Sequence, residues 1–492
     1  MTAGLVAGGH PAVAEAAASV LRQGGNAFDA VVAAGFAAAV AEPTLSSLGG
    51  GGFLLARTAG GAATLFDFFV DTPGRGLGPG AVEPHFEPVT IAFPGSDQVF
   101  NVGRGSVAVP GCLAGYLHVH ERLGRLPLRD VVAPAVDLAG GGVVVTPMAA
   151  ALCALLWPIF DRSPDTHALF APTGRALRAG DRMTNPDLAG FLTRLGDDPG
   201  HSFYRGALAE SFAADMAAGG GLVTEDDLAA FEVIERTPLA ADYRGHLVLT
   251  NPAPSFGGSL VACTLGLLAD GGTLPDRGSP DHAVALVEAM VETDRLRALG
   301  EVDARLQATR GTTHFSVADH EGNVASMTTS NGEASGYLVP GTGILLNNML
   351  GEDDLHPDGF HAAPAGERVA SMMSPTVVLD PSGPPALVVG SGGSKRIRTT
   401  IVQVVTAVVD HGVALRPAVE GPRLHWDGDV VQLEPGWPAE SVGALRRRWP
   451  VNEWTERNLY FGGAHAVVPA GPTGSGAAAG DPRRGGAALA VD

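Results

Sequence analysis

The sequence predicts a layered α+β domain in which strands pack together and helices cover them from outside. Two helices are expected early: Pro11 to Gln23, which begins at a proline and ends before Gly24, and Ala27 to Ala41, which is nearly all Ala, Val and Phe. After residue 311, short β-rich runs dominate. No internal repeat or low-complexity linker separates the two halves, so we expect one layered domain rather than two independent ones.

Alternating apolar and polar residues predict the strands. Phe53 to Ala56 and Ala63 to Phe68 are expected to pair around Gly60-Gly61. The region from Leu113 to about Leu268 is mainly helical in pattern. Long helices are also expected at Asp281 to Leu299 and Thr399 to Asp410. Further strands are predicted at Gly103 to Gly111, His314 to Ala318, Val324 to Thr328, Gly343 to Leu346, Thr376 to Leu379, Ala386 to Val389, Val430 to Leu433 and Ala464 to Val468.

Charge and cysteine content exclude several functions. The net charge is −20, from 52 acidic against 32 basic residues, and an acidic surface repels phosphate backbones. The few basic clusters, such as Arg483-Arg484, are too short to bind nucleic acid. Cys112, Cys153 and Cys263 are far apart and form no CxxC motif, so neither a disulfide framework nor a thiolate metal site is predicted. Small molecules or other copies of the chain are the expected partners.

The beginning of the chain lacks the basic and apolar segments of a secretory signal. The longest apolar run, Ala30 to Ala41, is too short and too rich in alanine to span a bilayer. With Met1 taken as the start, the sequence predicts a soluble cytoplasmic protein that does not contact membranes.

One stretch, Gly311 to Asp319, carries the chemistry. By itself it reads as a half-buried strand followed by a turn at Glu321 to Asn323, and its two adjacent threonines are ordinary strand formers. Four motifs rich in glycine or hydroxyl groups accompany it, and four successive glycines imply either positive φ angles or close backbone approach. These motifs are GGNAFDA at 24–30, SSLGGGGF at 46–53, PGTGILLNN at 340–348 and GSGGS at 390–394.

With these motifs in this order, and with SMMSPT at 371–376 and DYRG at 242–245, the chain resembles the γ-glutamyltransferase family of N-terminal-nucleophile hydrolases. The resemblance runs from His10 to Arg484. It implies a four-layer αββα sandwich and a precursor that cuts itself between Gly311 and Thr312. The products would be a large fragment, 1–311, and a small fragment, 312–492, which stay together; whether they dimerise further is left open.

The residue type at the cut suits this chemistry. A threonine hydroxyl is a weak nucleophile, and the α-amino group freed on Thr312 can act as its base. This amine titrates at roughly 8 in model compounds. Gly311 is expected to allow the strained backbone of an N-to-O acyl shift. Thr313 is the competing candidate, although the family cuts before the first threonine.

The resemblance assigns further residues around the nucleophile. Gly392 and Gly393 match the paired glycines whose N–H groups form the oxyanion hole. Ser330 stands where the family has a second threonine that bonds to the nucleophile, and Asn331 lies near the family's substrate-binding asparagine. His314 is expected to be structural, because this mechanism needs no histidine. No metal or cofactor is expected.

The glutamate pocket departs from the family. Phe69 takes the place of the arginine that holds the substrate α-carboxylate, and a phenyl ring cannot replace a guanidinium. Arg75 is a nearby substitute whose direction the sequence leaves open. Glu352, Asp353 and Asp354 remain as partners for a substrate amine. The other predicted substrate-binding residues are Met349, which replaces a glutamine, Ser371, and Met372, which replaces a serine.

The sequence therefore predicts a self-processing γ-glutamyltransferase-like amidohydrolase or acyltransferase with a rebuilt substrate pocket. A γ-glutamyl amide such as glutathione is the default substrate. One alternative keeps the mechanism but hydrolyses a C–C bond next to a keto acid, as γ-glutamyltransferase-like proteins do in alkylproline antibiotic pathways. Another is an acylase for a different side chain, such as glutaryl. The least favoured alternative is a non-catalytic binding protein.

Overall fold

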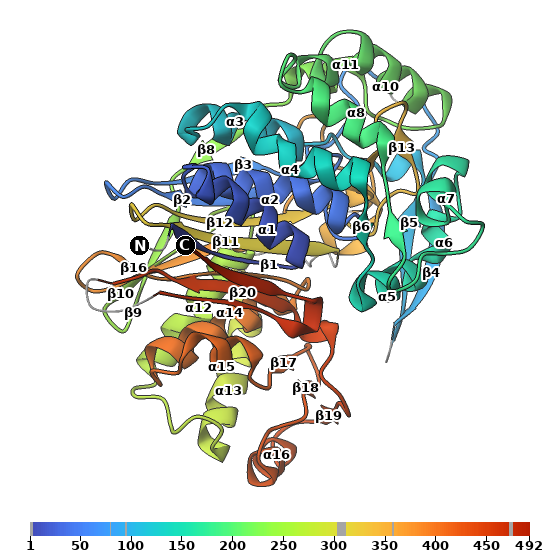
Figure 1. The fold of residues 1–492 in the computed structure, drawn as a ribbon. Coiled ribbons are helices and arrows are strands. Elements are labelled where there is room, and N and C mark those ends of the chain that lie inside the picture. The colour runs from blue at the N-terminus through green and yellow to red at the C-terminus, as the bar shows by residue number, and fades with distance from the viewer. Residues whose placement is uncertain (1–2, 79, 94–95, 303–310, 357–358, 472–475) are drawn as a thin grey trace.

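The computed structural model describes residues 3–78, 80–93, 96–302, 311–356, 359–471 and 476–492. Two sheets lie face to face in the middle of the molecule, with helices above one and below the other (Figure 1). The predicted αββα sandwich is confirmed. Among the described residues, none of the helices combines the length and the apolar character needed to cross a membrane.

The first sheet has seven strands, in the order β22-β1-β11-β12-β2-β3-β8. All neighbours in it are antiparallel, and β11 and β12 form the predicted hairpin at its centre. The strands are β1 (Gly4–Gly8), β2 (Gly51–Arg57), β3 (Ala63–Phe68), β8 (Ile234–Arg236), β11 (Thr312–Asp319), β12 (Val324–Ser330) and β22 (Ala487–Val491).

The second sheet has six strands, in the order β21-β20-β16-β15-β10-β9, and is also antiparallel. Strands β11 and β12 of the first sheet pack against β16 and β20 of the second. The strands are β9 (Leu239–Tyr243), β10 (His246–Thr250), β15 (Thr376–Leu379), β16 (Pro385–Gly392), β20 (Gly463–Val468) and β21 (Ala477–Gly480).

Two helical layers cover the outer faces (Figure 1). Above the first sheet lie α1 (Pro11–Arg22), α2 (Ala27–Ala41), α3 (Cys112–Leu123) and α4 (Leu128–Gly141); below the second lie α12 (Gly257–Asp270), α13 (Pro280–Ala298), α14 (Arg396–Val409) and α15 (Leu415–Glu420). The predicted burial of α2 is confirmed, because all its residues are buried; a capping box at Asn26 and Asp29 starts it.

Smaller elements flank the sandwich. A lobe beside the sheets contains β4 (Glu87–Phe93), β5 (Ser96–Val102), β6 (Val143–Val144), α5 (Pro147–Leu155), α6 (Trp157–Phe160), α7 (Pro164–Phe170), β7 (Arg182–Met183), α8 (Pro186–Arg194), α9 (His201–Tyr204), α10 (Ala207–Ala218) and α11 (Glu225–Ala230). The second half adds β13 (Leu338–Val339), β14 (Ile344–Leu345), β17 (Leu424–Trp426), β18 (Val431–Leu433), α16 (Ala439–Arg446) and β19 (Val451–Glu453). Single 3₁₀ turns are η1 (Arg104–Ser106), η2 (Met349–Gly351), η3 (Asp353–Leu355), η4 (Leu459–Phe461) and η5 (Pro482–Arg484).

Two local predictions are wrong. Gly103 to Gly111 contains the 3₁₀ turn η1 instead of a strand. The strand at Thr312–Asp319 is buried along its whole length instead of on one face only. The physical reason is the sandwich: one face of β11 packs on helices and the other on the second sheet, so polar side chains such as Ser316 are buried as well.

Candidate active site

The first two residues of β11 point to opposite faces of the sheet. Thr313 faces the helical layer, because its hydroxyl lies 3.3 and 3.4 Å from the two carboxyl oxygens of Glu42, the residue that ends α2. Ser316 donates to carbonyl groups of the second sheet. Every second residue of a strand lies on the same face, so Thr312 and Ser316, four positions apart, point to the same side. Thr312 therefore faces the space between the sheets, and geometry favours it over Thr313 as the nucleophile.

Thr312 sits beside the bond that is predicted to break. The Ser330 hydroxyl donates a short hydrogen bond to the Gly311 carbonyl and accepts one from the Gly332 N–H at 3.1 Å. Thr312 is fully buried, and its hydroxyl forms no hydrogen bond with any described residue. Ser330 therefore contacts the carbonyl before the cut, whereas the sequence predicted a bond to the nucleophile itself.

Glycine is required at position 311 for space. A Cβ on Gly311 would lie 1.8 Å from the carbonyl oxygen of Gly332. Backbone strain at this glycine stays a prediction, and the close approach of Gly332 adds a steric reason for glycine. The same holds for the glycines before β2, where a Cβ on Gly50 would lie 2.2 Å from the Ser330 carbonyl oxygen and a Cβ on Gly49 2.3 Å from that of Leu345.

The paired glycines of the predicted oxyanion hole lie opposite the nucleophile. Gly392 ends β16 of the second sheet, and a Cβ there would lie 2.2 Å from the Thr312 carbonyl oxygen. Gly393 has a φ of +119°, a conformation that side chains other than glycine rarely adopt. Two strands from different sheets thus bring Thr312 and these glycines together across the middle of the sandwich.

Two charged residues that the sequence did not single out also lie here. Arg484 is 6% exposed and donates to the Thr312 carbonyl at 3.2 Å. Burial, followed by repulsion from Arg396, lowers the pKa of Arg484 to about 10. Burial raises the pKa of Glu42 to about 8, against the Thr313 hydrogen bond and the attraction of Arg484, which lower it. A proton can therefore be held or released near neutral pH next to the threonines.

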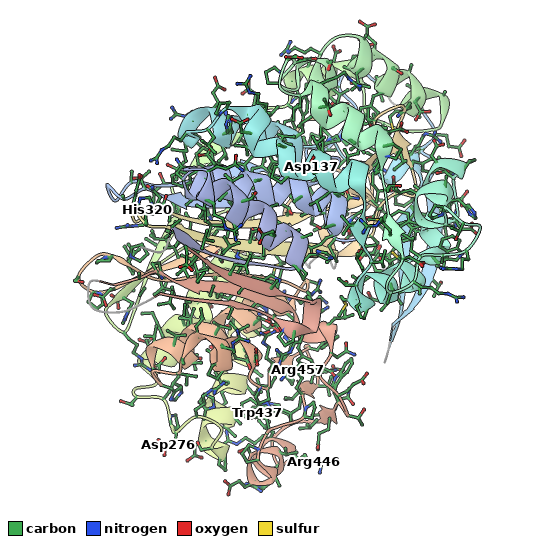
Figure 2. The ribbon with its side chains drawn as sticks, viewed as in Figure 1. Asp137, Asp276, His320, Trp437, Arg446 and Arg457 are labelled. Carbon is green, nitrogen blue, oxygen red and sulfur yellow. The ribbon has the colours of Figure 1, made fainter. Side chains whose placement is uncertain are left out.

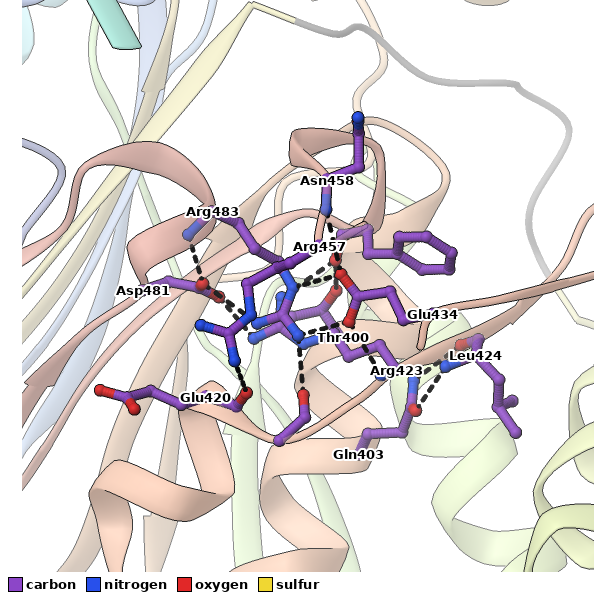
Figure 3. A network of polar contacts seen from close by, with 12 residues as sticks. Thr400, Gln403, Glu420, Arg423, Leu424, Glu434, Arg457, Asn458, Asp481 and Arg483 are labelled. Carbon is purple, nitrogen blue, oxygen red and sulfur yellow. Dashed lines mark hydrogen bonds and ion pairs between the residues drawn. The ribbon is translucent and has the colours of Figure 1, made fainter. Parts of the chain in front are cut away.

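A buried ionic network fixes the turn that carries Arg484 (Figure 3). Asp481 accepts from Arg423 at 2.5 Å, from Arg483 at 3.1 Å and from the Ala464 N–H at 2.9 Å. Arg483 also pairs with Glu434. Opposite charges with several hydrogen bonds each can stay buried together, and losing one partner would leave an uncompensated charge. The network thus positions Arg484.

His314 is fully buried between the sheets and bonded through both ring nitrogens. Nδ1 lies 2.8 Å from the Thr328 hydroxyl and Nε2 3.0 Å from the Ser316 hydroxyl. Burial, together with nearby His465, lowers the pKa of His314 well below its ordinary value. This geometry suits a neutral structural histidine.

Some predicted substrate-binding residues gather near the cut and others do not. Asn331 is fully buried, and its Oδ1 has no hydrogen-bond partner among the described residues. Glu352 is buried beside Gly332, where an added Cβ would lie 2.4 Å from its carboxyl oxygen. Asp353 is exposed, and its role in substrate binding stays a prediction. The Asp354 side chain lies outside the described part of the structure.

The residues that replace the glutamate pocket are apolar core. Phe69 and Met349 are fully buried in one cluster, and the Phe69 ring stacks on Phe53 at 5.5 Å. Ser371 and Met372 lie elsewhere, against the beginning of α12. The Ser371 carbonyl accepts from the Phe256 N–H, and Met372 packs in a separate cluster with Phe256.

Arg75 does not replace the missing arginine. Its side chain is 41% exposed, lies 3.9 Å from Asp227, and covers Gly366, where a Cβ would meet the guanidinium at 2.0 Å. Arg368 also lies beside Phe69, but its guanidinium donates to the Phe69 carbonyl and pairs with Asp71 at 3.0 Å. Neither guanidinium has a contact with Thr312 or Ser330 among the described residues.

A cavity of about 80 Å³ adjoins Gly311. Arg396 and Arg484 supply positive charge to its wall and Glu333 supplies a carboxyl group. The Arg396 guanidinium also lies 4.5 Å above the Tyr460 ring. The apolar part of the lining is formed by Leu45, Leu152, Leu155, Leu156, Leu459 and Trp454. The cavity is thus mainly apolar, with two cations in its wall beside the bond that is predicted to break.

The sequence contains only weak signals for Glu42 and Arg484, the two charged residues beside the threonines that it did not predict. Glu42 is the first charged residue after a helix that is otherwise almost wholly apolar, which indicates burial. Arg484 belongs to the short basic pair Arg483-Arg484, whose local pattern predicts no catalytic site. Contacts between residues as far apart as 172 positions place it at Thr312, and local patterns do not contain such information.

Comparisons with known proteins show which family and which proteins this chain is similar to. The sequence profile described as Gamma-glutamyltranspeptidase matches residues 13–307 and 299–491. The chain is 33% identical to the Acylase ACY 1 proenzyme of Pseudomonas sp. (strain SE83), covering 90% of this chain and 86% of that protein. It is 30% identical to the Glutathione hydrolase proenzyme of Escherichia coli (strain K12), covering 98% and 90%. The crystal structure of cephalosporin acylase from Bacillus halodurans superposes with a TM-score of 0.85 at 27% identity, covering 100% of this chain and 96% of that one.

Proposed function

Because the chain belongs to the gamma-glutamyltranspeptidase family of N-terminal-nucleophile hydrolases and transferases, we propose that it cuts itself between Gly311 and Thr312 and then uses Thr312 as its nucleophile. One observation carries this proposal. The Gly311 carbonyl accepts a hydrogen bond from Ser330, next to a buried Thr312 hydroxyl with no hydrogen-bond partner among the described residues. An electrophile and a nucleophile are thus prepared side by side.

Self-cleavage follows from these positions. The Thr312 oxygen attacks the Gly311 carbonyl carbon, and the Ser330 hydroxyl stabilises the charge that develops on the carbonyl oxygen. The C–N bond then breaks as the Thr312 nitrogen takes up the proton that the hydroxyl released, which leaves an ester on the Thr312 oxygen and a free α-amino group. Water hydrolyses the ester, so Gly311 ends in a carboxylate and the Thr312 hydroxyl is restored.

Turnover reuses the same hydroxyl. The freed α-amine of Thr312 takes the hydroxyl proton as its oxygen attacks the carbonyl of a substrate amide. The N–H groups of Gly392 and Gly393 would stabilise the oxyanion, and the amine of the substrate leaves with the proton. Water, or an acceptor amine, then releases the acyl group from Thr312. Asn331 Oδ1 is a buried acceptor that a bound amino group can satisfy.

Sheet topology supports a stable pair of fragments. In the seven-stranded sheet, β1 of fragment 1–311 lies between β22 and β11 of fragment 312–492, and β12 pairs with β2. In the six-stranded sheet, β10 pairs with β15 across the same boundary. Separation of the fragments would break backbone ladders in both sheets, so we expect a tight heterodimer.

The substrate we propose is an amide whose acyl group is apolar along its length and ends in a carboxylate. The same hydroxyl attacks Gly311 and the substrate, so the cavity beside Gly311 is where the acyl group of the substrate fits. Its leucines match an alkyl chain, and Arg396 or Arg484 can pair with a carboxylate. Phe69 supports this choice, because it takes the place of the family's arginine and lies in an apolar cluster, so it offers no positive charge to the α-carboxylate of a glutamate.

Two experiments test the proposal. Mass spectrometry of the purified protein should find fragments that end at Gly311 and begin at Thr312; an uncut chain of 50.1 kDa would contradict it. A panel of p-nitroanilides with glutaryl, γ-glutamyl and hexanoyl groups should then be hydrolysed, glutaryl fastest and hexanoyl slowest. Fast turnover of the γ-glutamyl substrate alone would contradict the rebuilt pocket. Cleavage of a β-diketone, with every amide inert, would favour the C–C bond hydrolase.

A further inference from the structure

A second cavity lies in the helical layer beneath the six-stranded sheet. Its volume is about 290 Å³, and it opens between the beginning of α13, the end of α14, and α15. Trp437 and Asp276 mark this region in the lower part of Figure 2, on the other side of the six-stranded sheet from β11. The two cavities have no lining residue in common. The second cavity is therefore separate from the site at Thr312.

The charges of this cavity are opposite to those of the chain. The protein has 52 acidic and 32 basic residues, yet Arg277, His282, His411 and Arg423 line the cavity, and none of the described lining residues is Asp or Glu. Arg423 is engaged by Asp481. The other three groups face the cavity without a carboxylate in the lining, so an anion is the complement that it lacks.

Each of the three groups can donate a hydrogen bond. His282 Nδ1 accepts from the Gly278 N–H at 3.2 Å, so its hydrogen is on Nε2. His411 Nε2 is buried and has no hydrogen-bond partner among the described residues. Among the described residues, the Arg277 guanidinium donates a weak hydrogen bond, 3.5 Å long, to the Pro417 carbonyl, and it lies over Gly421, another lining residue.

The remaining walls suit a compact apolar body. The His282 ring stacks on Trp437 with an interplanar angle of 22°, and His411 meets His282 edge-on at 5.2 Å. Leu286, Ala407 and Ala418 complete an apolar lining. Small-molecule sites combine such walls with a few convergent polar groups, and about 300 Å³ is the lower end of their range.

We propose that this cavity is a second binding site, for a small organic carboxylate with an aromatic or compact apolar body. The carboxylate accepts from Arg277, His282 and His411, and the apolar part lies along Trp437. Binding involves no covalent step and does not depend on self-cleavage.

The binding should strengthen as pH falls. Burial lowers the pKa of His282 to about 4 and also lowers that of His411, and Arg277 adds to both effects. Asp410 and Asp276 act in the opposite direction on His411, but Asp410 is paired with Arg244 at 3.0 Å. Arg423 is the remaining charged group of the lining. A bound carboxylate favours the protonated histidines, so lower pH favours the complex.

Isothermal titration calorimetry of the whole purified protein tests the site, with benzoate as probe and benzamide as its neutral match. Benzoate should bind saturably, and benzamide about tenfold or more weakly, because it lacks charge-assisted hydrogen bonds. Arg277→Gln should weaken benzoate binding by a similar factor. Arg416→Gln, a change on the exposed side of α15, should not alter it. Arg277 is exposed, so its loss should not unfold the protein.

A second readout uses the aromatic wall. Benzoate should change the tryptophan fluorescence of the native protein, and Trp437→Phe should abolish that change. Affinity should be higher at about pH 5.5 than at about pH 7.5. Equal affinity for benzoate and benzamide, equal behaviour of Arg277→Gln and Arg416→Gln, or non-saturable heats would each overturn the proposal.

Discussion

A row of neighbouring residues crosses the seven-stranded sheet from β11 through β12 and β2 to the end of β3, and the two ends of this row differ in composition. At one end, Thr312 pairs with Ser330 and Ser330 with Gly51, so hydroxyl groups and glycines surround the scissile bond. At the other end is Phe69, which follows Phe68, the partner of Gly52. Three strand spacings separate Phe69 from Thr312, a distance of about 14 Å. At that end, Phe53, Phe69 and Met349 form a dry cluster.

The difference separates chemistry from recognition. The reactive end depends on backbone positions and the absence of Cβ atoms, because carbonyl groups and strands approach too closely for larger residues. The apolar end depends on side-chain volume, which can be exchanged as long as the space stays filled. Changes at the first end should stop the reaction, whereas changes at the second should alter stability and substrate choice.

Removing the nucleophile should have the largest effect on the reaction. Thr312→Ala lacks the attacking oxygen, so we expect one uncut band of 50.1 kDa on a denaturing gel and no hydrolysis. Thr313→Val is the matched control, because Thr313 faces Glu42 and the helices. It should still be cut before Thr312. If Thr312→Ala were cut and Thr313→Val were not, Thr313 would be the nucleophile instead.

The next effect is expected at the oxyanion glycines. In Gly392→Ala the added methyl group would lie 2.2 Å from the Thr312 carbonyl oxygen, so one strand must shift. Turnover should fall by about 100-fold or more, the loss seen when an oxyanion donor is removed. Gly266→Ala in α12 is the control, since no atom lies within 4 Å of its added Cβ. Unchanged kinetics in Gly392→Ala would remove Gly392 from the site.

Loss of the Ser330 hydroxyl should slow self-cleavage less. Ser330→Ala removes the hydrogen bond to the Gly311 carbonyl. The rate of cutting, followed by gel after refolding, should fall by roughly 10- to 100-fold, about 1.4–2.7 kcal/mol of activation free energy. Ser330→Thr keeps a hydroxyl and should restore most of the rate. If both variants are slow to the same degree, shape rather than the hydroxyl group is responsible.

At the apolar end, stability should change more than the reaction. Phe69→Ala leaves a cavity beside Phe53 and should lower the free energy of unfolding by about 3–5 kcal/mol in urea titrations. The chain should still cut itself, because Phe69 does not contact Thr312. Phe69→Leu fills most of the space and should cost less. A loss of cutting with normal stability would tie Phe69 to the chemistry.

The last effect concerns the pH dependence of stability, not the reaction. Glu42 has a pKa of about 8 in the folded protein, above its ordinary 4.5. The folded state therefore binds the proton more tightly than the unfolded one, so this stabilisation is complete below pH 4.5 and is lost as pH rises to about 8. Thermal unfolding of Glu42→Gln should depend less on pH across this window than that of the native protein. Parallel curves would contradict the raised pKa.

The core helices and strands could be predicted from the sequence because each depends on a pattern of residues within its own segment. Alternation marked both strands of the central hairpin, and the alanine-rich run from Ala27 to Ala41 forms α2 with the same bounds. The outer strands β1 and β22 were not predicted. Each is short and rich in small residues, and they form a sheet edge only by pairing across nearly the whole chain.

The sequence by itself predicted the residues that we propose carry out the reaction. The order of its glycine and hydroxyl motifs points to Thr312, Gly392 and Gly393, because close backbone approach permits few residue types at these positions. Only the tertiary structure decided that Ser330 contacts Gly311, that Arg484 and Glu42 lie beside the two threonines, that Arg75 lies beside Asp227 and that Asp353 is exposed. The direction and the charge of a side chain depend on its burial and on its contacts with residues far away in the sequence. Neither can be predicted from the neighbouring residues in the sequence.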